Sequence, residues 1–148
     1  MDSYLKSPDS TQAVLYDGWM HTGDAGYLDD QGFLFVADRY KDMIVSGGEN
    51  VYSVEVERVL YLHPAVQEAA VIGVPHQQWG ESVHALVVLR QGSQADAQEL
   101  MRFFREHIAG YKVPRSIDFQ DQPLPTTPVG KIRKNVIRDQ FLDHLGKN

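Results

Sequence analysis

The sequence predicts a small α+β domain, in which a short, mostly antiparallel sheet packs in two layers with helices on one of its faces. The first observation is the order of elements after residue 42, where apolar runs of strand length alternate with segments of helical periodicity. The second is composition: 148 residues, 43% hydrophobic and 23% charged, are enough to bury a core without disulfides. The chain contains no cysteine, which excludes disulfide scaffolds and thiol catalysis.

The segment before residue 42 predicts a β-hairpin. Residues 1–18 are turn-rich and show little apolar periodicity. Two apolar runs, Tyr27–Leu28 and Phe33–Val36, then flank the acidic loop Asp29–Gly32. Two such runs around a short loop that contains glycine are typical of a hairpin.

A domain boundary is expected where this hairpin ends, at Asp38–Lys41. Residues 1–40 would then form the first domain, of which residues 1–18 look unable to fold by themselves because they show little apolar periodicity. Residues 41–148 would form the second domain, which holds every predicted helix.

The first half of the second domain predicts a strand, a loop, a helix and two further strands. Ser53 is expected to cap the helix, Glu55 lies in its first turn, and His63-Pro64 ends it. The remaining ranges are a strand at Met43–Val45, a loop at Ser46–Asn50, strands at Val66–Val74 and His84–Arg90, and a loop between them with Pro75 and Trp79–Glu81.

The second half begins with a helix over Ala95–Ala109. Its apolar residues recur at helical spacing and form one stripe that faces the core, and Gly110 is expected to close the helix. The stripe consists of Leu100, Phe103, Phe104 and Ile108. A strand at Ser116–Gln120, a proline-rich loop at Pro123–Gly130 and a last helix at Asn135–Leu145 follow.

The charge distribution limits the classes of partner. The net charge of −6 argues against a protein that binds nucleic acid through phosphates. Residues 101–148 nevertheless carry 9 Lys/Arg and 5 Asp/Glu, so this third could meet a polyphosphate ligand, or it could be a solvated helical face. The apolar runs are too short to cross a bilayer, so no transmembrane segment is expected. The absence of cysteine suits a cytoplasmic location.

Six residues have side chains or backbone suited to a polar ligand, each with a simpler alternative. Asp24 can accept hydrogen bonds from a diol, or it is an ordinary turn residue. Arg39 and Lys41 suit a phosphate, or they are exposed linker cations. Gly47 and Gly48 can expose their backbone N–H groups to a ligand, or they belong to a plain turn. Lys131, after a proline-rich loop, could reach an anion outside its own domain, or it is one of several solvated cations. The histidines are not spaced as metal ligands, so no metal site is expected.

Taken in order, three motifs resemble the C-terminal region of the adenylate-forming superfamily, which includes acyl-CoA synthetases and acid–CoA ligases. Trp19–Asp24 is similar to the Trp-x-x-Thr-Gly-Asp motif. Asp38–Glu57 is similar to the segment of the hinge motif, Arg-x-Lys-Asp-x-Ile-x-x-Gly-Gly-Glu-Asn. Leu124–Arg133 is similar to the motif of the catalytic lysine.

The resemblance implies a two-step ligase, with ATP and CoA as substrates, a fatty or aryl carboxylic acid, and Mg²⁺ bound with ATP at a site outside this chain. It implies that Asp24 and Arg39 hold the nucleotide ribose, Lys41 is the hinge, and Lys131 is the catalytic lysine of adenylation. The residues implied to contact CoA are Ser46, Gly47, Gly48, Glu49, Trp79 and Tyr111.

The resemblance also implies a partner that this chain lacks. The large N-terminal domain of the superfamily holds the phosphate loop and the acid pocket, and the resemblance implies that residues 1–40 are only its C-terminal remnant. We therefore expect this chain to be inactive alone. Two alternatives stay open. The chain could be a binding or regulatory module without catalysis, or a fragment of a peptide-synthetase adenylation domain.

Overall fold

The computed structural model describes residues 3–145 and divides the chain into two compact units, Met1–Lys41 and Asp42–Asn148. The outer ends of the two predicted domains, residues 1–2 and 146–148, lie outside the described residues. Within residues 3–145, no helix has the length and apolar character that crossing a membrane requires.

The first unit contains one helix and two hairpins. The elements are α1 (Pro8–Val14), β1 (Leu15–Tyr16), β2 (Trp19–Met20), β3 (Asp24–Leu28) and β4 (Leu34–Arg39). The sequence analysis missed α1, although Pro8 and Asp9 in its first turn are typical of a helix start. The predicted hairpin is confirmed as β3 and β4, which pair antiparallel. Its loop is closed by the Asp29 carboxylate, which accepts the backbone N–H groups of Gln31 and Phe33.

The second unit is built on one sheet. Strand β8 lies in the middle: β7 pairs antiparallel with one edge, while β5 and then β9 pair with the other. Only the β8–β9 pair is parallel, so the prediction of an α+β fold with a mostly antiparallel sheet is confirmed. In chain order the elements are η1 (Tyr40–Asp42, which crosses the boundary between the units), β5 (Ile44–Ser46), β6 (Glu49–Val51), α2 (Ser53–Leu62), β7 (Val66–His76), β8 (Gly80–Leu89), α3 (Ala97–His107), η2 (Gly110–Lys112), β9 (Ser116–Phe119) and α4 (Lys134–Leu145).

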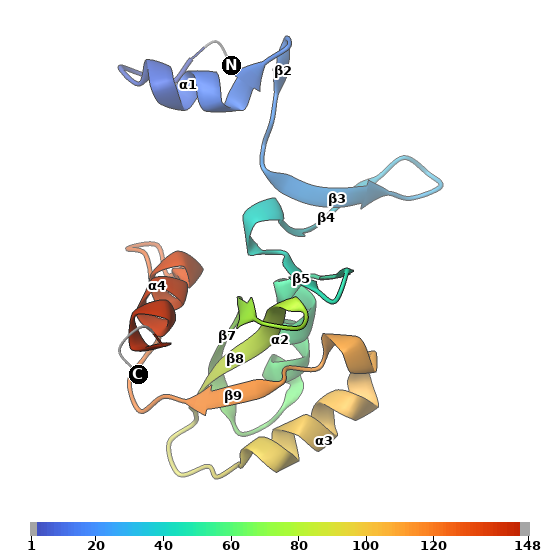
Figure 1. Cartoon of the computed structure of the whole chain (residues 1–148), viewed down its shortest axis with the longest axis vertical. Coiled ribbons are helices and arrows are strands. Elements are labelled where there is room, and N and C mark those ends of the chain that lie inside the picture. Colours follow the sequence, from blue (N-terminus) through green and yellow to red (C-terminus); the bar gives the residue numbers. More distant parts are fainter. Residues whose placement is uncertain (1–2, 146–148) are drawn as a thin grey trace. The chain divides into compact units, whose positions relative to one another are not determined.

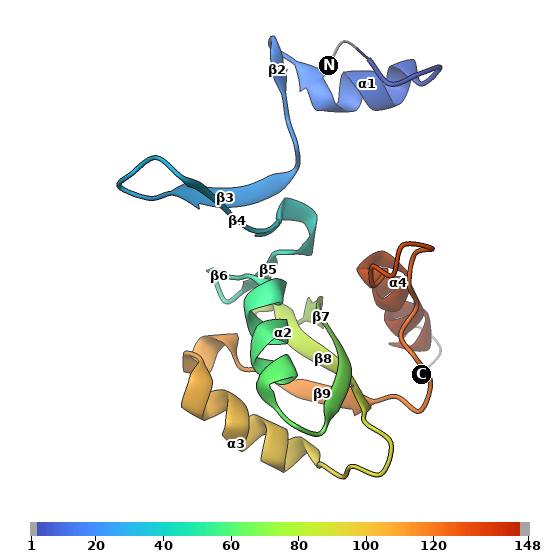
Figure 2. The same cartoon turned by 180° about the vertical axis from the view of Figure 1, so that it is seen from behind.

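Helices cover both faces of this sheet, whereas the sequence analysis placed them on one face. Alternate residues of β7 point to opposite faces: Ala69 and Val71 pack in the core under α2 and α3, and Ala70 and Ile72 pack in a second core under α4. Figure 1 and Figure 2 show α4 on the side of the sheet opposite α2. The sheet therefore lies between two helical layers, with Ile137 (2% exposed) anchoring α4.

Two predicted helix ends are wrong. Tyr52, not Ser53, is the N-cap of α2, and the Ser53 hydroxyl instead accepts a hydrogen bond from Lys134 Nζ at 2.7 Å. Helix α3 ends at His107, because its C-cap, Ile108, has an extended backbone. Gly110 begins the short turn η2 rather than closing the helix. The beginning of α3 is well defined, because the Asp96 carboxylate accepts the backbone N–H of Glu99.

Two predicted loops are shorter in the structure. The segment Ser46–Asn50 is mostly strand, because β6 pairs with β5 and leaves only Gly47-Gly48 as the turn. Their φ values of +62° and +88° fit a tight hairpin turn, which needs positive φ at both central residues. The loop between β7 and β8 shrinks to residues 77–79, because Pro75 belongs to β7 and Gly80 to β8.

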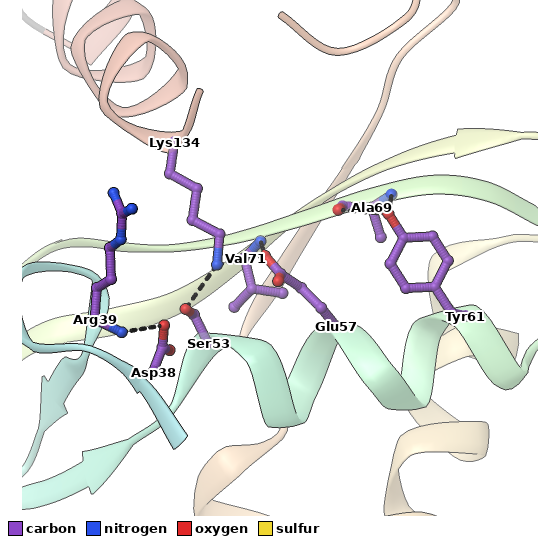
Figure 3. Close-up of polar contacts among 8 residues, drawn as sticks. All are labelled: Asp38, Arg39, Ser53, Glu57, Tyr61, Ala69, Val71 and Lys134. Carbon is purple, nitrogen blue, oxygen red and sulfur yellow. Dashed lines mark hydrogen bonds and ion pairs between the residues drawn. The ribbon is translucent and has the colours of Figure 1, made fainter. Parts of the chain in front are cut away.

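The outer edge of β7 is covered by side chains of α2, as Figure 3 shows. The Tyr61 hydroxyl accepts the N–H of Ala69 and donates to its carbonyl, both at 3.2 Å. The Glu57 carboxylate accepts the N–H of Val71 at 2.8 Å. Main-chain groups that have no neighbouring strand are satisfied in this way.

Candidate functional site

The sequence-predicted residues fall into three clusters, the first of them in the first unit. Asp24 and Arg39 lie opposite each other, at the start of β3 and the end of β4. The Tyr40 N–H donates to the Gly23 carbonyl at 2.8 Å and holds the next residues, including Lys41, beside them. Six residues line an open depression of about 530 Å³: Thr22, Gly23, Asp24, Arg39, Tyr40 and Lys41.

This depression combines one exposed carboxylate with two exposed cations. A carboxylate accepts hydrogen bonds from hydroxyl groups, and a guanidinium and an ammonium attract anions. The expected nucleotide-binding residues Asp24 and Arg39 are therefore neighbours, and Lys41 lies on the same lining.

The second cluster surrounds Trp79, in the turn between β7 and β8. The Gly47 N–H donates to the Trp79 carbonyl at 3.0 Å, and a Cβ added at Gly47 would lie 3.3 Å from the indole ring. The His76 ring stacks on the indole, with 4.3 Å between ring centroids. The Arg115 guanidinium carbon lies 3.3 Å from the centroid of the same ring. A cation over an indole ring is a favourable arrangement.

The expected contacts Gly47 and Trp79 are thus brought together, along with Ser46, which pairs with Gly80. Gly48, in the turn between β5 and β6, and Glu49, the first residue of β6, are both exposed. Arg115 and His76 were not among the predicted site residues. Nothing local in the sequence links Arg115 to a tryptophan 36 positions earlier, whereas the pairing of β5 and β9 with β8 makes them neighbours.

Tyr111, the remaining residue expected near CoA, lies in η2, four residues before Arg115, and its side chain is exposed. The next residue, Lys112, has its Nζ 2.6 Å from a carboxylate oxygen of Glu55. This hydrogen bond raises the pKa of Lys112 above its ordinary value, against a smaller opposing effect of burial. The ion pair fastens η2 to α2 and so fixes where Tyr111 lies.

The third cluster is the loop that carries Lys131. Thr126 and Ile132 form an isolated antiparallel bridge, and the Thr127 N–H donates to the Lys131 carbonyl at 2.7 Å. The Lys131 N–H donates in return to the Thr127 hydroxyl at 3.1 Å. Gly130 completes the tip with a φ of +80°. The loop is therefore a closed hairpin, which presents an exposed lysine at its tip.

The described residues contain no group of three or more His, Asp or Glu side chains that could hold a metal ion. The three clusters offer exposed cations, carboxylates that can accept hydrogen bonds from hydroxyl groups, and an aromatic surface. Such groups can bind and orient an anionic ligand that carries hydroxyl groups.

Comparison with known proteins gives a family. The profile described as "AMP-binding enzyme C-terminal domain" matches residues 55–131, which is more than half of the chain. The chain belongs to this family. The matched range includes the Trp79 turn and ends at Lys131.

Curated relatives are similar to the chain over nearly its whole length. The chain is 48% identical to a long-chain-fatty-acid–CoA ligase of Bacillus subtilis (strain 168) over 97% of its residues, and 50% identical to a feruloyl-CoA synthase of Amycolatopsis sp. over 95%. It covers 26% and 28% of those two proteins. A solved structure of o-succinylbenzoate CoA synthetase from Bacillus subtilis, in complex with its acyl-adenylate intermediate, superposes with a TM-score of 0.83 at 42% identity, over 95% of this chain and 28% of that one. The chain therefore spans little more than a quarter of the proteins it matches.

Proposed function

We propose that this chain is the C-terminal part of an ATP-dependent carboxylic acid–CoA ligase. The observation that supports it most strongly is an exposed lysine, Lys131, at the tip of a closed hairpin in a chain that is about half identical to acid–CoA ligases over nearly all its length. Relatives of almost equal identity act on fatty and aromatic acids, so the proposal extends to the reaction and leaves the acid open.

The proposed reaction has two steps. In the first, a carboxylate oxygen attacks the α-phosphorus of ATP, the bond to the β-phosphate bridging oxygen breaks, and pyrophosphate leaves. In the second, the thiol sulfur of CoA attacks the acyl carbonyl, the bond to AMP breaks, and the thiol proton passes to solvent. Both steps bring together groups that repel each other or develop negative charge, which preorganised cations counteract.

We assign the clusters to these steps by their chemistry. Lys131 would lie between the carboxylate and the α-phosphate and stabilise the charge of the first transition state. Asp24 and Arg39 would hold the ribose hydroxyls of ATP and AMP. The Trp79 turn, with Ser46, Gly47, Gly48 and Glu49 beside it and Tyr111 on η2, would receive CoA in the second step.

Two surfaces of one domain then serve two steps, which requires a change of conformation between them. We propose that Lys41, at the boundary between the units, is the hinge. The first unit, residues 1–40 in this assignment, would belong to a larger N-terminal domain that binds Mg²⁺ with ATP. This agrees with its lack of a core: none of its described apolar side chains is buried.

The test is a Lys131→Ala substitution in the ligase that contains this chain. We expect pyrophosphate exchange to fall by about 10²–10³-fold or more, since a preorganised electrostatic group of the transition state is removed. The matched control is Arg133→Ala, an exposed cation two residues away, which should leave exchange unchanged. Unchanged exchange in Lys131→Ala would instead favour a binding or regulatory module. The 148-residue chain by itself should form no thioester from ATP, acid and CoA.

A further inference from the structure

Both ends of the hairpin that carries Lys131 are linked to β7, the first directly through Glu68 and the second through Glu57 of α2. At its first end, the Leu124 N–H donates to Glu68 Oε2 at 2.8 Å, and the Leu124 side chain (5% exposed) is buried in the second core. Glu68 belongs to β7. The Arg133 N–H donates to the Pro125 carbonyl at 2.8 Å, which closes the hairpin below its tip.

At its second end, Lys134 is the first residue of α4, and its side chain reaches across to α2 (Figure 3). Lys134 Nζ lies 2.8 Å from Glu57 Oε1 and donates to the Ser53 hydroxyl at 2.7 Å. The same Glu57 oxygen accepts the N–H of Val71, on β7. The side chains of Lys134 and Glu57 are both only 13% exposed.

An ion pair with this burial is a rigid link. Its partners are shielded from water and from salt, and each has a second hydrogen bond that fixes its direction. Removing one partner leaves the other charge unpaired and poorly solvated, so the remaining side chain no longer stays in its position. Lys134 therefore holds the second end of the hairpin in place, three residues from the lysine at its tip.

We propose that Lys134 is a positioning residue for adenylation. Its ion pair with Glu57, together with the Glu68–Leu124 hydrogen bond, fixes both ends of the hairpin to β7 and so fixes where Lys131 presents its ammonium group. This role rests on the proposed function of Lys131. A displacement of about 1 Å at a reacting group can cost about 10²-fold in rate, so a loosened hairpin should be visible in kinetics.

The test compares two half-reactions in the ligase that contains this chain. Pyrophosphate exchange measures adenylation, and transfer to CoA from a supplied acyl-adenylate measures the second step. Lys134→Met and Glu57→Gln should lower kcat of exchange by about 10–100-fold, leave KM for ATP unchanged, and leave transfer unchanged. The matched control is Glu99→Gln on α3. It removes the carboxylate that pairs with His63 and should alter neither step.

Equal losses in both half-reactions would show a purely structural role and overturn the proposal, as would unchanged exchange. If Lys134→Met does not fold, Glu57→Gln carries the test, because its amide oxygen can still accept the Val71 N–H. Lys131→Ala separates the two ideas: if it retains exchange, the proposed function fails, whereas if it abolishes exchange and Lys134→Met does not weaken it, only the positioning role fails.

A second measurement needs no activity. In the 148-residue chain, amide hydrogen exchange at Thr127, Gly130 and Lys131 reports how firmly the hairpin is closed, because each of these N–H groups is bonded within it. Lys134→Met should speed exchange at these amides relative to Glu99→Gln, with the amides of β8 unchanged. Equal exchange in the two variants would show that the ion pair does not hold the hairpin.

Discussion

Replacing Ile137 by alanine tests whether α4 is held to the sheet by the second core. Ile137 is 2% exposed and is the one fully buried side chain among the described side chains of α4. Truncating a buried isoleucine to alanine typically costs 2–5 kcal/mol, depending on how far the site can collapse. Ile137 also lines an open cavity of about 280 Å³ with Leu86 and Phe141, so its neighbours have room to move. We therefore expect about 2–3 kcal/mol, the lower part of the range.

The matched control is Ile44→Ala, in the first core. Ile44, on β5, is 0% exposed and packs in the core with residues of α2, so its loss should cost more, about 4 kcal/mol. Urea unfolding followed by circular dichroism measures both, with an expected midpoint shift of about 1–2 M for Ile137→Ala. If Ile137→Ala costs as much as Ile44→Ala, the argument from the cavity is wrong. If it costs less than about 1 kcal/mol, the second core does not hold α4.

Two further predictions concern the Trp79 turn and the centre of the sheet. Gly47→Ala should lower the free energy of unfolding by about 1–2 kcal/mol, because of its positive φ, and should shift the fluorescence of Trp79. Gly48→Ala, with the same strain but nothing within 4 Å of the added Cβ, should lose stability without that shift, and equal spectra would contradict the packing described. Burial lowers the pKa of His84 below its ordinary value of 6.5, against a smaller opposing effect of Asp118. The unfolded chain therefore binds a proton that the folded chain does not, so stability should fall as pH drops below about 6.5. Urea unfolding at several pH values, compared with His84→Asn, should show this loss only in the parent chain.

The helices and strands were predictable wherever local periodicity matches the burial that tertiary packing imposes. The stripe on α3 is confirmed, with Leu100 and Phe104 buried and Phe103 and Ile108 packed at the margin of the core. The position of α4 was not predicted, yet the sequence holds a signal for it. The uninterrupted apolar run Ala69–Val74 is typical of a strand covered on both faces, because alternation is lost when neither face meets water.

The sequence motifs indicated which residues belong to the candidate site, but not which distant residues contact them. Lys131, Arg133 and Lys134 are three similar cations in the sequence, and no local pattern indicates which of them is buried. The distinction arises from Glu57, 77 positions before Lys134, which the packing of α2 against β7 brings within 2.8 Å. The contact between Arg115 and Trp79 was missed for the same reason, since the two residues become neighbours only when the sheet has formed.

The covering of β7 also bears on self-association. The stretch Ala69–Val74 carries no charge and no proline, and an uncovered outer strand of this composition is a template on which another chain can add a strand. Tyr61 and Glu57 occupy the main-chain groups of Ala69 and Val71 and so close this edge. Glu57 thus protects the protein from aggregation through the same carboxylate that holds Lys134. A variant that loses the acceptor oxygen at this position, such as Glu57→Ala, should be handled at low concentration, because it leaves the Val71 N–H uncovered.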